Sequence, residues 1–181
     1  MGRQVLLVRH GEVSPACRGL CYGQSDVRLS PAGEEQSLRL VAELAALPIT
    51  QLFHSGLGRT SFLADRVAAR AGVPAVGDPD LRERDFGAWE LRAWDDIYAE
   101  VGSAMDGLLL DPGGYAPPGG ETTFALRDRV LRWYGRLPEE GVIVAITHGG
   151  PVAALAGALR GWPVERWPQL IPAWGSVVRL P

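Results

Sequence analysis

The sequence of 181 residues predicts an α/β fold, a three-layer α/β/α sandwich with a mostly parallel central sheet. Two short runs, Val5–Val8 and Val142–Ile146, are entirely apolar, which is typical of strands that a parallel sheet buries on both faces. Between strand-like runs, apolar residues recur at helical spacing, so strands and helices alternate along the chain. The 46% hydrophobic and 22% charged residues are typical of a globular protein, and the length suffices for one well-buried domain over residues 1–181.

The elements are placed in chain order from these patterns and from the residues that begin or end them. Ser30-Pro31 is a helix N-cap followed by a first-turn proline, and Pro48 ends that helix. Strands are expected at residues 3–8, 49–53, 74–76, 142–146 and 176–180. Helices are expected at residues 31–47, 57–71, 91–105, 122–137 and 151–159.

Other segments are expected to lie outside this alternation. Residues 10–29 form a loop, and the Gly- and Pro-rich residues 107–120 are expected to hold neither helix nor strand. Residues 84–120 as a whole are expected to form a cap or flap within the single domain. The charged face of residues 127–136 is expected to be a solvated helix surface.

Polar side chains that can donate hydrogen bonds to an anion follow three of the predicted strands. They are Arg9 and His10 after the first, Ser55 and Arg59 after the second, and Thr147 and His148 after residues 142–146. In open parallel sheets, ligands bind beyond the carboxyl ends of the strands, so these side chains are expected at one edge. Two histidines and two arginines there form a pocket for a dianion such as a phosphate group.

Composition excludes several other functions. All eighteen basic residues are arginine, which removes Schiff-base chemistry and the phosphate-loop lysine, although a genomic bias explains the missing lysine equally well. The net charge of −3 gives no reason to expect a nucleic-acid or membrane partner, and no apolar run is long enough to span a membrane. Cys17 and Cys21 are too few for a structural zinc site, and the chain is expected to be cytoplasmic. Since arginine can neutralise a phosphate without a metal, no cofactor is expected.

In this order and spacing, six motifs resemble the histidine phosphatase superfamily, which has the phosphoglycerate mutase-like fold. The motifs are Arg9-His10-Gly11-Glu12, residues 29–36, Ser55-Gly56-Leu57-Gly58-Arg59, Leu81-Arg82-Glu83, Gly119-Gly120-Glu121-Thr122 and Thr147-His148-Gly149-Gly150. The resemblance covers nearly the whole chain. It departs from the family at Ala16, where an asparagine often contacts phosphate, and at Gly56, which replaces a proline.

The resemblance implies a role for each central residue. His10 would be the nucleophile and would form a phosphohistidine. Arg9, Arg59 and His148 would hold the phosphoryl oxygens and stabilise their charge in the transition state. Glu83 would protonate the leaving oxygen and then activate water.

The remaining assignments are open to alternatives. Asp85 is the next candidate for the acid, Glu12 is expected to pair with an arginine, and His54 is expected to lie in the core or behind the site. Packing explains Trp89 and Trp94 as well as a substrate contact does. The residues expected to touch substrate besides Arg9 and Arg59 are Gly23, Gln24, Ser25, Trp89, Thr147 and Gly149.

The segment Cys21–Asp26, taken with Phe86–Glu90, most resembles the α-ribazole phosphatases of cobalamin biosynthesis. This implies a small-molecule phosphomonoester, α-ribazole 5′-phosphate, whose apolar benzimidazole would stack on aromatic side chains. Two other functions remain open. One is a broad phosphatase for sugar phosphates or nucleotides, and the other is a non-catalytic module that binds a phosphorylated ligand.

Overall fold

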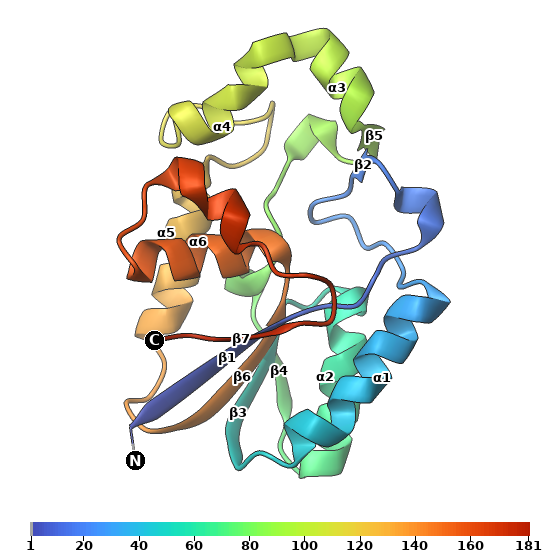
Figure 1. Cartoon of the computed structure of the whole chain (residues 1–181), viewed down its shortest axis with the longest axis vertical. Helices are drawn as coiled ribbons and strands as arrows, with labels where there is room; N and C mark the ends of the chain where they lie inside the picture. The colour runs from blue at the N-terminus through green and yellow to red at the C-terminus, as the bar shows by residue number, and fades with distance from the viewer. Residues whose placement is uncertain (1) are drawn as a thin grey trace.

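The computed structural model describes residues 2–181 and has the predicted mostly parallel sheet between two layers of helices (Figure 1). The strand order is β4-β3-β6-β1-β7, in which only β7 runs antiparallel to its neighbour. The strands of this sheet are β1 (Arg3–Arg9), β3 (Ile49–His54), β4 (Ala75–Gly77), β6 (Gly141–Thr147) and β7 (Val177–Arg179). A second, two-stranded sheet pairs β2 (Leu20–Cys21) with β5 (Arg92–Ala93).

The described residues form six α-helices. They are α1 (Pro31–Ala45), α2 (Gly58–Ala71), α3 (Trp94–Val101), α4 (Gly107–Leu110), α5 (Thr123–Gly135) and α6 (Gly149–Leu159). Of these, α1, α2, α5 and α6 pack on the main sheet. Short 3₁₀ helices lie at Pro15–Cys17, Pro79–Leu81, Gly87–Trp89, Gly102–Asp106 and Val164–Leu170. No helix within residues 2–181 has the length and apolar character needed to cross a membrane.

Alternate residues of the central strands face opposite helical layers, which explains why these strands are continuously apolar. Leu6 and Val8 pack with α1 and α2, whereas Val5 and Leu7 pack with α5 and α6. The predicted helix signals are also confirmed. Ser30 Oγ accepts a hydrogen bond from Gly33 N at 2.9 Å, and α2 ends at Gly72 in the left-handed conformation with φ of 72°.

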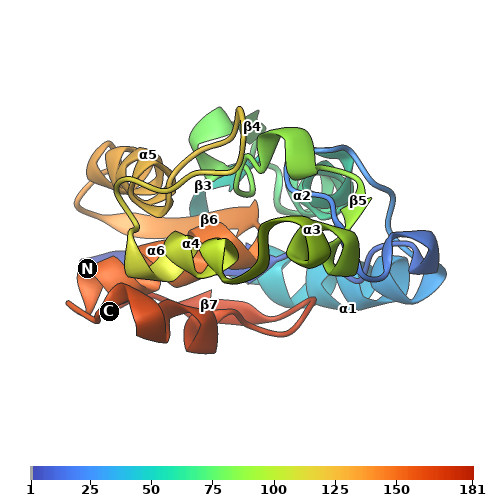
Figure 2. The same cartoon turned by 90° about the horizontal axis from the view of Figure 1, so that it is seen from above.

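Residues 84–120, called the cap below, lie beyond the carboxyl ends of the central strands (Figure 1). Seen from above, α3 and α4 run across the other elements (Figure 2). The prediction of one helix at 91–105 was wrong, because Gly102 has a φ of 55° and ends α3. The prediction of no helix in 107–120 was also wrong: α4 forms one turn, and its Leu108 packs against the cap's apolar cluster.

The cap has its own small core. Cys21, Trp89 and Ile97 are buried at its centre, and Phe86 and Trp94 pack against them. The Phe86 and Trp94 rings meet edge to face with centroids 5.3 Å apart. The short β2–β5 ladder, which sequence patterns did not indicate, fastens the loop after β1 to this cap.

Candidate active site

The register of β1 and β6 brings the two predicted histidines together. Arg9 pairs with Thr147 at the ends of these parallel strands, so His10 and His148 follow side by side. Their ring centroids are 5.0 Å apart at an interplanar angle of 65°, and their residues are 2% and 0% exposed. The expected convergence at the carboxyl edge of the sheet is therefore present.

His10 is held in one tautomer. Its Nδ1 lies 2.7 Å from the Gly11 carbonyl oxygen, which can only accept, so Nδ1 carries the proton and Nε2 keeps a lone pair. Burial, the Arg59 charge and, more weakly, the Arg9 charge lower the pKa of His10 to about 3, against an opposing effect of the Gly11 carbonyl. His10 is therefore neutral at physiological pH, with a free nitrogen that can attack an electrophile.

His148 is the N-cap residue of α6 and has a partner on each ring nitrogen. Arg59 Nε donates to Nδ1 at 3.3 Å, so the proton of the neutral ring is on Nε2, 2.8 Å from Ser55 Oγ. The Ser55 hydroxyl is itself 2.9 Å from Thr60 Oγ1. Burial, followed by the charge of Arg59, lowers the pKa of His148 well below its ordinary value.

The two predicted arginines flank the histidines. Arg59 is 1% exposed and donates its terminal nitrogens to the carbonyl oxygens of Gly23 and Ser25. Arg9 donates Nη1 to the Pro172 carbonyl, while its buried Nε has no hydrogen-bond partner among the described residues. The site thus carries two fixed positive charges beside two neutral imidazoles, which suits a dianion.

The Glu83 side chain lies beside the first turn of α6. Its Oε2 accepts from Gly150 N at 3.2 Å, and its Oε1 accepts from Arg84 N at 2.8 Å. A Cβ at Gly150 would lie 2.1 Å from Glu83 Oε1, and a Cβ at Gly149 would lie 3.4 Å from the Arg9 guanidinium carbon. Gly150 therefore lets the Glu83 carboxylate approach the positive end of α6, whereas the atom that a Cβ at Gly149 would meet most closely is Ile171 Cγ2, at 2.9 Å.

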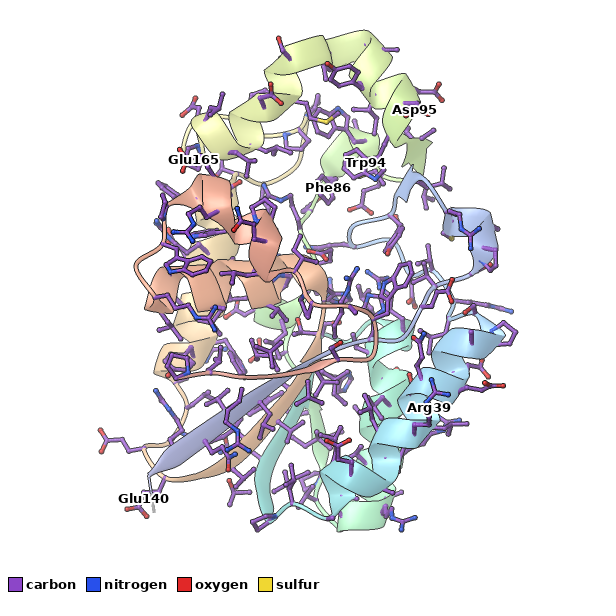
Figure 3. All side chains as sticks on the ribbon, in the orientation of Figure 1. Arg39, Phe86, Trp94, Asp95, Glu140 and Glu165 are labelled. Atoms are coloured by element: carbon purple, nitrogen blue, oxygen red, sulfur yellow. The ribbon has the colours of Figure 1, made fainter. Side chains whose placement is uncertain are left out.

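A cavity of about 390 Å³ lies beside Arg9 and Glu83. Its lining residues are Arg9, Leu20, Tyr22, Gly23, Glu83, Arg84, Phe86, Trp94, Gly150 and Ile171. A second cavity of about 210 Å³ shares Leu20, Tyr22 and Trp94 with it and is also lined by Glu12 and Trp174. Figure 3 shows Phe86 and Trp94 between α3 and the carboxyl ends of the central strands.

Several predicted contact residues are used to build the site. Glu90 accepts from Gln24 N at 2.8 Å and from the Ser25 backbone and hydroxyl, which fixes the loop that binds Arg59. Thr147 is buried and donates its hydroxyl to the Leu81 carbonyl at 2.6 Å. Trp89 is buried in the cap and is absent from the lining of both cavities.

The alternative interpretations are also placed by the structure. Ala16 is exposed on a 3₁₀ helix, next to Pro15 and Cys17 of the smaller cavity. Glu12 lies 3.8 Å from Arg18, the expected kind of partner. His54 is half-buried at the end of β3, where its Nδ1 accepts from Gly56 N at 3.1 Å.

Three site residues were missed from the sequence. The ring of Tyr22 lies 5.4 Å from the Arg59 guanidinium carbon, and the ring of Trp174 lies 5.3 Å from that of Arg9. Arg129 of α5 contradicts the expectation of a solvated face, because it donates to the backbone that carries Glu83. The one usable signal was Glu121 in the Gly-Gly-Glu-Thr motif, a carboxylate that needs a cationic partner and finds it in Arg129.

Comparison with known proteins agrees with this geometry. The sequence profile of the histidine phosphatase superfamily (branch 1) matches residues 5–181. A glucosyl-3-phosphoglycerate phosphatase of Mycolicibacterium vanbaalenii is 32% identical over 181 residues, covering 93% of this chain and 79% of that protein. A Salmonella choleraesuis protein named probable phosphoglycerate mutase GpmB is 33% identical over 171 residues, covering 88% and 76%.

A solved structure extends the likeness to the fold. The α-ribazole phosphatase from Shigella flexneri has a TM-score of 0.84 at 27% identity, covering 97% of this chain and 89% of that one. The profile match thus covers nearly the full chain. It includes the sheet, the paired histidines and the two arginines beside them. This chain belongs to the histidine phosphatase superfamily, branch 1, and is a phosphatase of that family.

Proposed function

We propose that this phosphatase hydrolyses phosphomonoesters through a phosphohistidine formed on His10. The single observation that carries the proposal is the state of the His10 ring. Its Nδ1 proton is held by the Gly11 carbonyl, and burial and the arginines keep the ring neutral, so Nε2 is an available nucleophile. A histidine kept only for packing would not need this tautomer beside two guanidinium groups.

The residues around His10 supply the charge stabilisation. Arg9 and Arg59 offer guanidinium donors to the three phosphoryl oxygens, and the N-terminus of α6 adds its positive end. A bound dianion also favours a protonated His148, because it offsets the Arg59 charge that disfavours the imidazolium. In this state Nδ1 no longer accepts from Arg59 Nε; it donates its proton to the phosphoryl group, while Nε2–H stays on Ser55.

Glu83 is the proposed acid and base. In the first step His10 Nε2 bonds to phosphorus, the ester P–O bond breaks, and a protonated Glu83 gives its proton to the leaving oxygen. In the second step Glu83 takes a proton from water, the water oxygen bonds to phosphorus, and the P–N bond breaks to release phosphate. Glu83 and Arg9 both line the larger cavity, through which we propose that the leaving group departs.

For the substrate we propose α-ribazole 5′-phosphate. The larger cavity has room for the ribose phosphate, and the smaller one adjoins it, because Tyr22 and Trp94 line both. Trp174 completes an aromatic wall there, which is suited to stack on a flat apolar ring such as benzimidazole. The likeness to the α-ribazole phosphatase from Shigella flexneri supports this choice.

A second candidate is a broader phosphatase for sugar phosphates, favoured by Arg84. Its guanidinium lines the larger cavity and donates to Thr123 Oγ1 at 2.9 Å, which leaves further donors for a second anionic group on the substrate. The glucosyl-3-phosphoglycerate phosphatase relative keeps this candidate open.

The experiment is a comparison of kcat/KM for α-ribazole 5′-phosphate, ribose 5-phosphate, a nucleoside monophosphate and glucosyl-3-phosphoglycerate. We expect the first to be best, and Trp174→Ala to raise its KM about tenfold more than that of ribose 5-phosphate, because loss of the contact with Arg9 affects both substrates and loss of stacking only the first. Tyr98→Ala, an exposed cap residue that lines neither cavity, is the matched control. A preference for glucosyl-3-phosphoglycerate would select the second candidate, and no turnover of any of the four esters would contradict both substrate proposals.

A further inference from the structure

The backbone that carries Glu83 is held in an unusual way. Four consecutive carbonyl oxygens, those of residues 80–83, each accept a hydrogen bond from a side chain. Thr147 binds the carbonyl of Leu81, and one arginine binds the other three. In a helix or a sheet, backbone N–H groups would satisfy such carbonyl oxygens. Here the side chains supply the hydrogen bonds instead.

That arginine is Arg129 on α5. Its Nη1 donates to the carbonyls of Asp80 and Arg82, both at 2.7 Å, and its Nη2 donates to the Glu83 carbonyl at 2.9 Å. The Arg129 side chain is only 11% exposed. All of these contacts are to backbone, so Arg129 fixes the position of the chain without contacting the Glu83 carboxylate.

Glu121 completes the arrangement. Its carboxylate accepts hydrogen bonds from Nε of Arg129 at 3.1 Å and from Nη2 at 2.6 Å. The Glu121 side chain is 16% exposed. The same carboxylate accepts from Asp85 N at 3.0 Å, and Glu121 N donates to Asp85 O at 2.9 Å. The chain is thus held on both sides of Glu83 by a partly buried ion pair whose two members also bind backbone.

We propose that Arg129 is a positioning residue for the general acid: it sets the distance of the Glu83 carboxyl from the leaving oxygen without touching substrate. This inference rests on the proposed acid role of Glu83. The rigidity of the backbone at Glu83 matters because a displacement of a catalytic group by about 1 Å lowers the rate about a hundredfold.

The test compares kcat/KM, which reports the steps through leaving-group release, for an alkyl phosphate and for p-nitrophenyl phosphate. Arg129→Met is expected to lose about a hundredfold with the alkyl ester and about threefold or less with the aryl ester, whose leaving group barely needs a proton. Inhibition by inorganic phosphate is expected to stay within about threefold, because the phosphate pocket is intact. Arg132→Met is the matched control, since Arg132 lies on the same helix and binds only the Asp80 carboxylate.

Two further variants keep the proposal falsifiable if Arg129→Met does not fold. Arg129→Lys keeps the charge but lacks the planar fork, and Glu121→Gln removes the charge that orients it; both are expected to show the same selective loss, more weakly. Equal losses with both esters, or the same selective loss in Arg132→Met, would overturn the positioning role. Glu83→Gln is measured in parallel: if it shows no ester selectivity, the acid assignment itself fails, whereas selectivity in Glu83→Gln alone refutes only the role of Arg129.

Discussion

Arg59 donates from Nε to Nδ1 of His148 at 3.3 Å, and this bond links the main cation of the site to its second histidine. The same guanidinium donates to the carbonyls of Gly23 and Ser25. Arg59 therefore fixes the His148 tautomer and the loop after β2 together, in addition to supplying charge.

Replacing Arg59 by lysine tests this double role. A lysine keeps a positive charge but has one nitrogen on a flexible stem, so it cannot reach His148 and two carbonyls at once. We expect Arg59→Lys to lower kcat/KM about 10²- to 10³-fold, the cost of removing one preorganised donor from a transition state. Steady-state kinetics with p-nitrophenyl phosphate measure it; activity within threefold of the wild type would mean that charge alone suffices.

Gly150 is the position where a single added methyl group should disturb the acid. Its Cβ would lie 2.1 Å from Glu83 Oε1, so Gly150→Ala must displace the carboxylate. We expect kcat/KM for an alkyl phosphate to fall about a hundredfold. Gly135→Ala is the control, because a Cβ there meets nothing within 4 Å. Equal activity of the two variants would show that the Glu83–Gly150 contact is not used.

The buried histidines also predict how stability depends on pH. The folded pKa of His10 is about 3, below the unfolded value of 6.5, so the unfolded chain binds more protons in acid. This stability is present above pH 6.5 and is lost as the pH falls toward 3. We expect the difference in the His10 pKa between the folded and unfolded states to lower the free energy of unfolding by about 2 kcal/mol as the pH falls from 7.5 to 5. Urea denaturation of the wild type and His10→Gln checks it: the variant should lose less stability on acidification, and parallel curves would refute it.

The fold and the centre of the site follow from short-range sequence signals. Val5–Val8 and Val142–Ile146 are apolar throughout and end in the same chemistry, so their pairing already placed His10 beside His148. Arg129 could not be found in this way, because an arginine that binds backbone carbonyls looks like any charged residue on a helix face. Trp174 was missed because it lies between elements and reaches the site only through the tertiary fold.

The cap shows a similar limit of sequence patterns. Its apolar residues suggested one long helix, but Gly102 adopts a positive φ and the chain turns after Val101. Glycine permits either conformation, so only the packing of the cap decides between them.

Metal dependence is a further test. Arginine and histidine surround the proposed phosphate position, and guanidinium groups can balance the charge of a phosphate dianion. We expect turnover to be unchanged after dialysis against a chelator and after addition of magnesium or zinc. Activity that disappears with the chelator and returns with either metal would contradict this part of the mechanism.

Trapping the covalent intermediate tests the central claim most directly. The enzyme is mixed with a ³²P-labelled phosphomonoester, quenched in alkali within the first turnover, digested and mapped by mass spectrometry, with His10→Asn as the control. The account predicts a base-stable, acid-labile label on the peptide that contains His10 and none in the variant. A label on a serine, or His10→Asn activity within tenfold of the wild type, would contradict it.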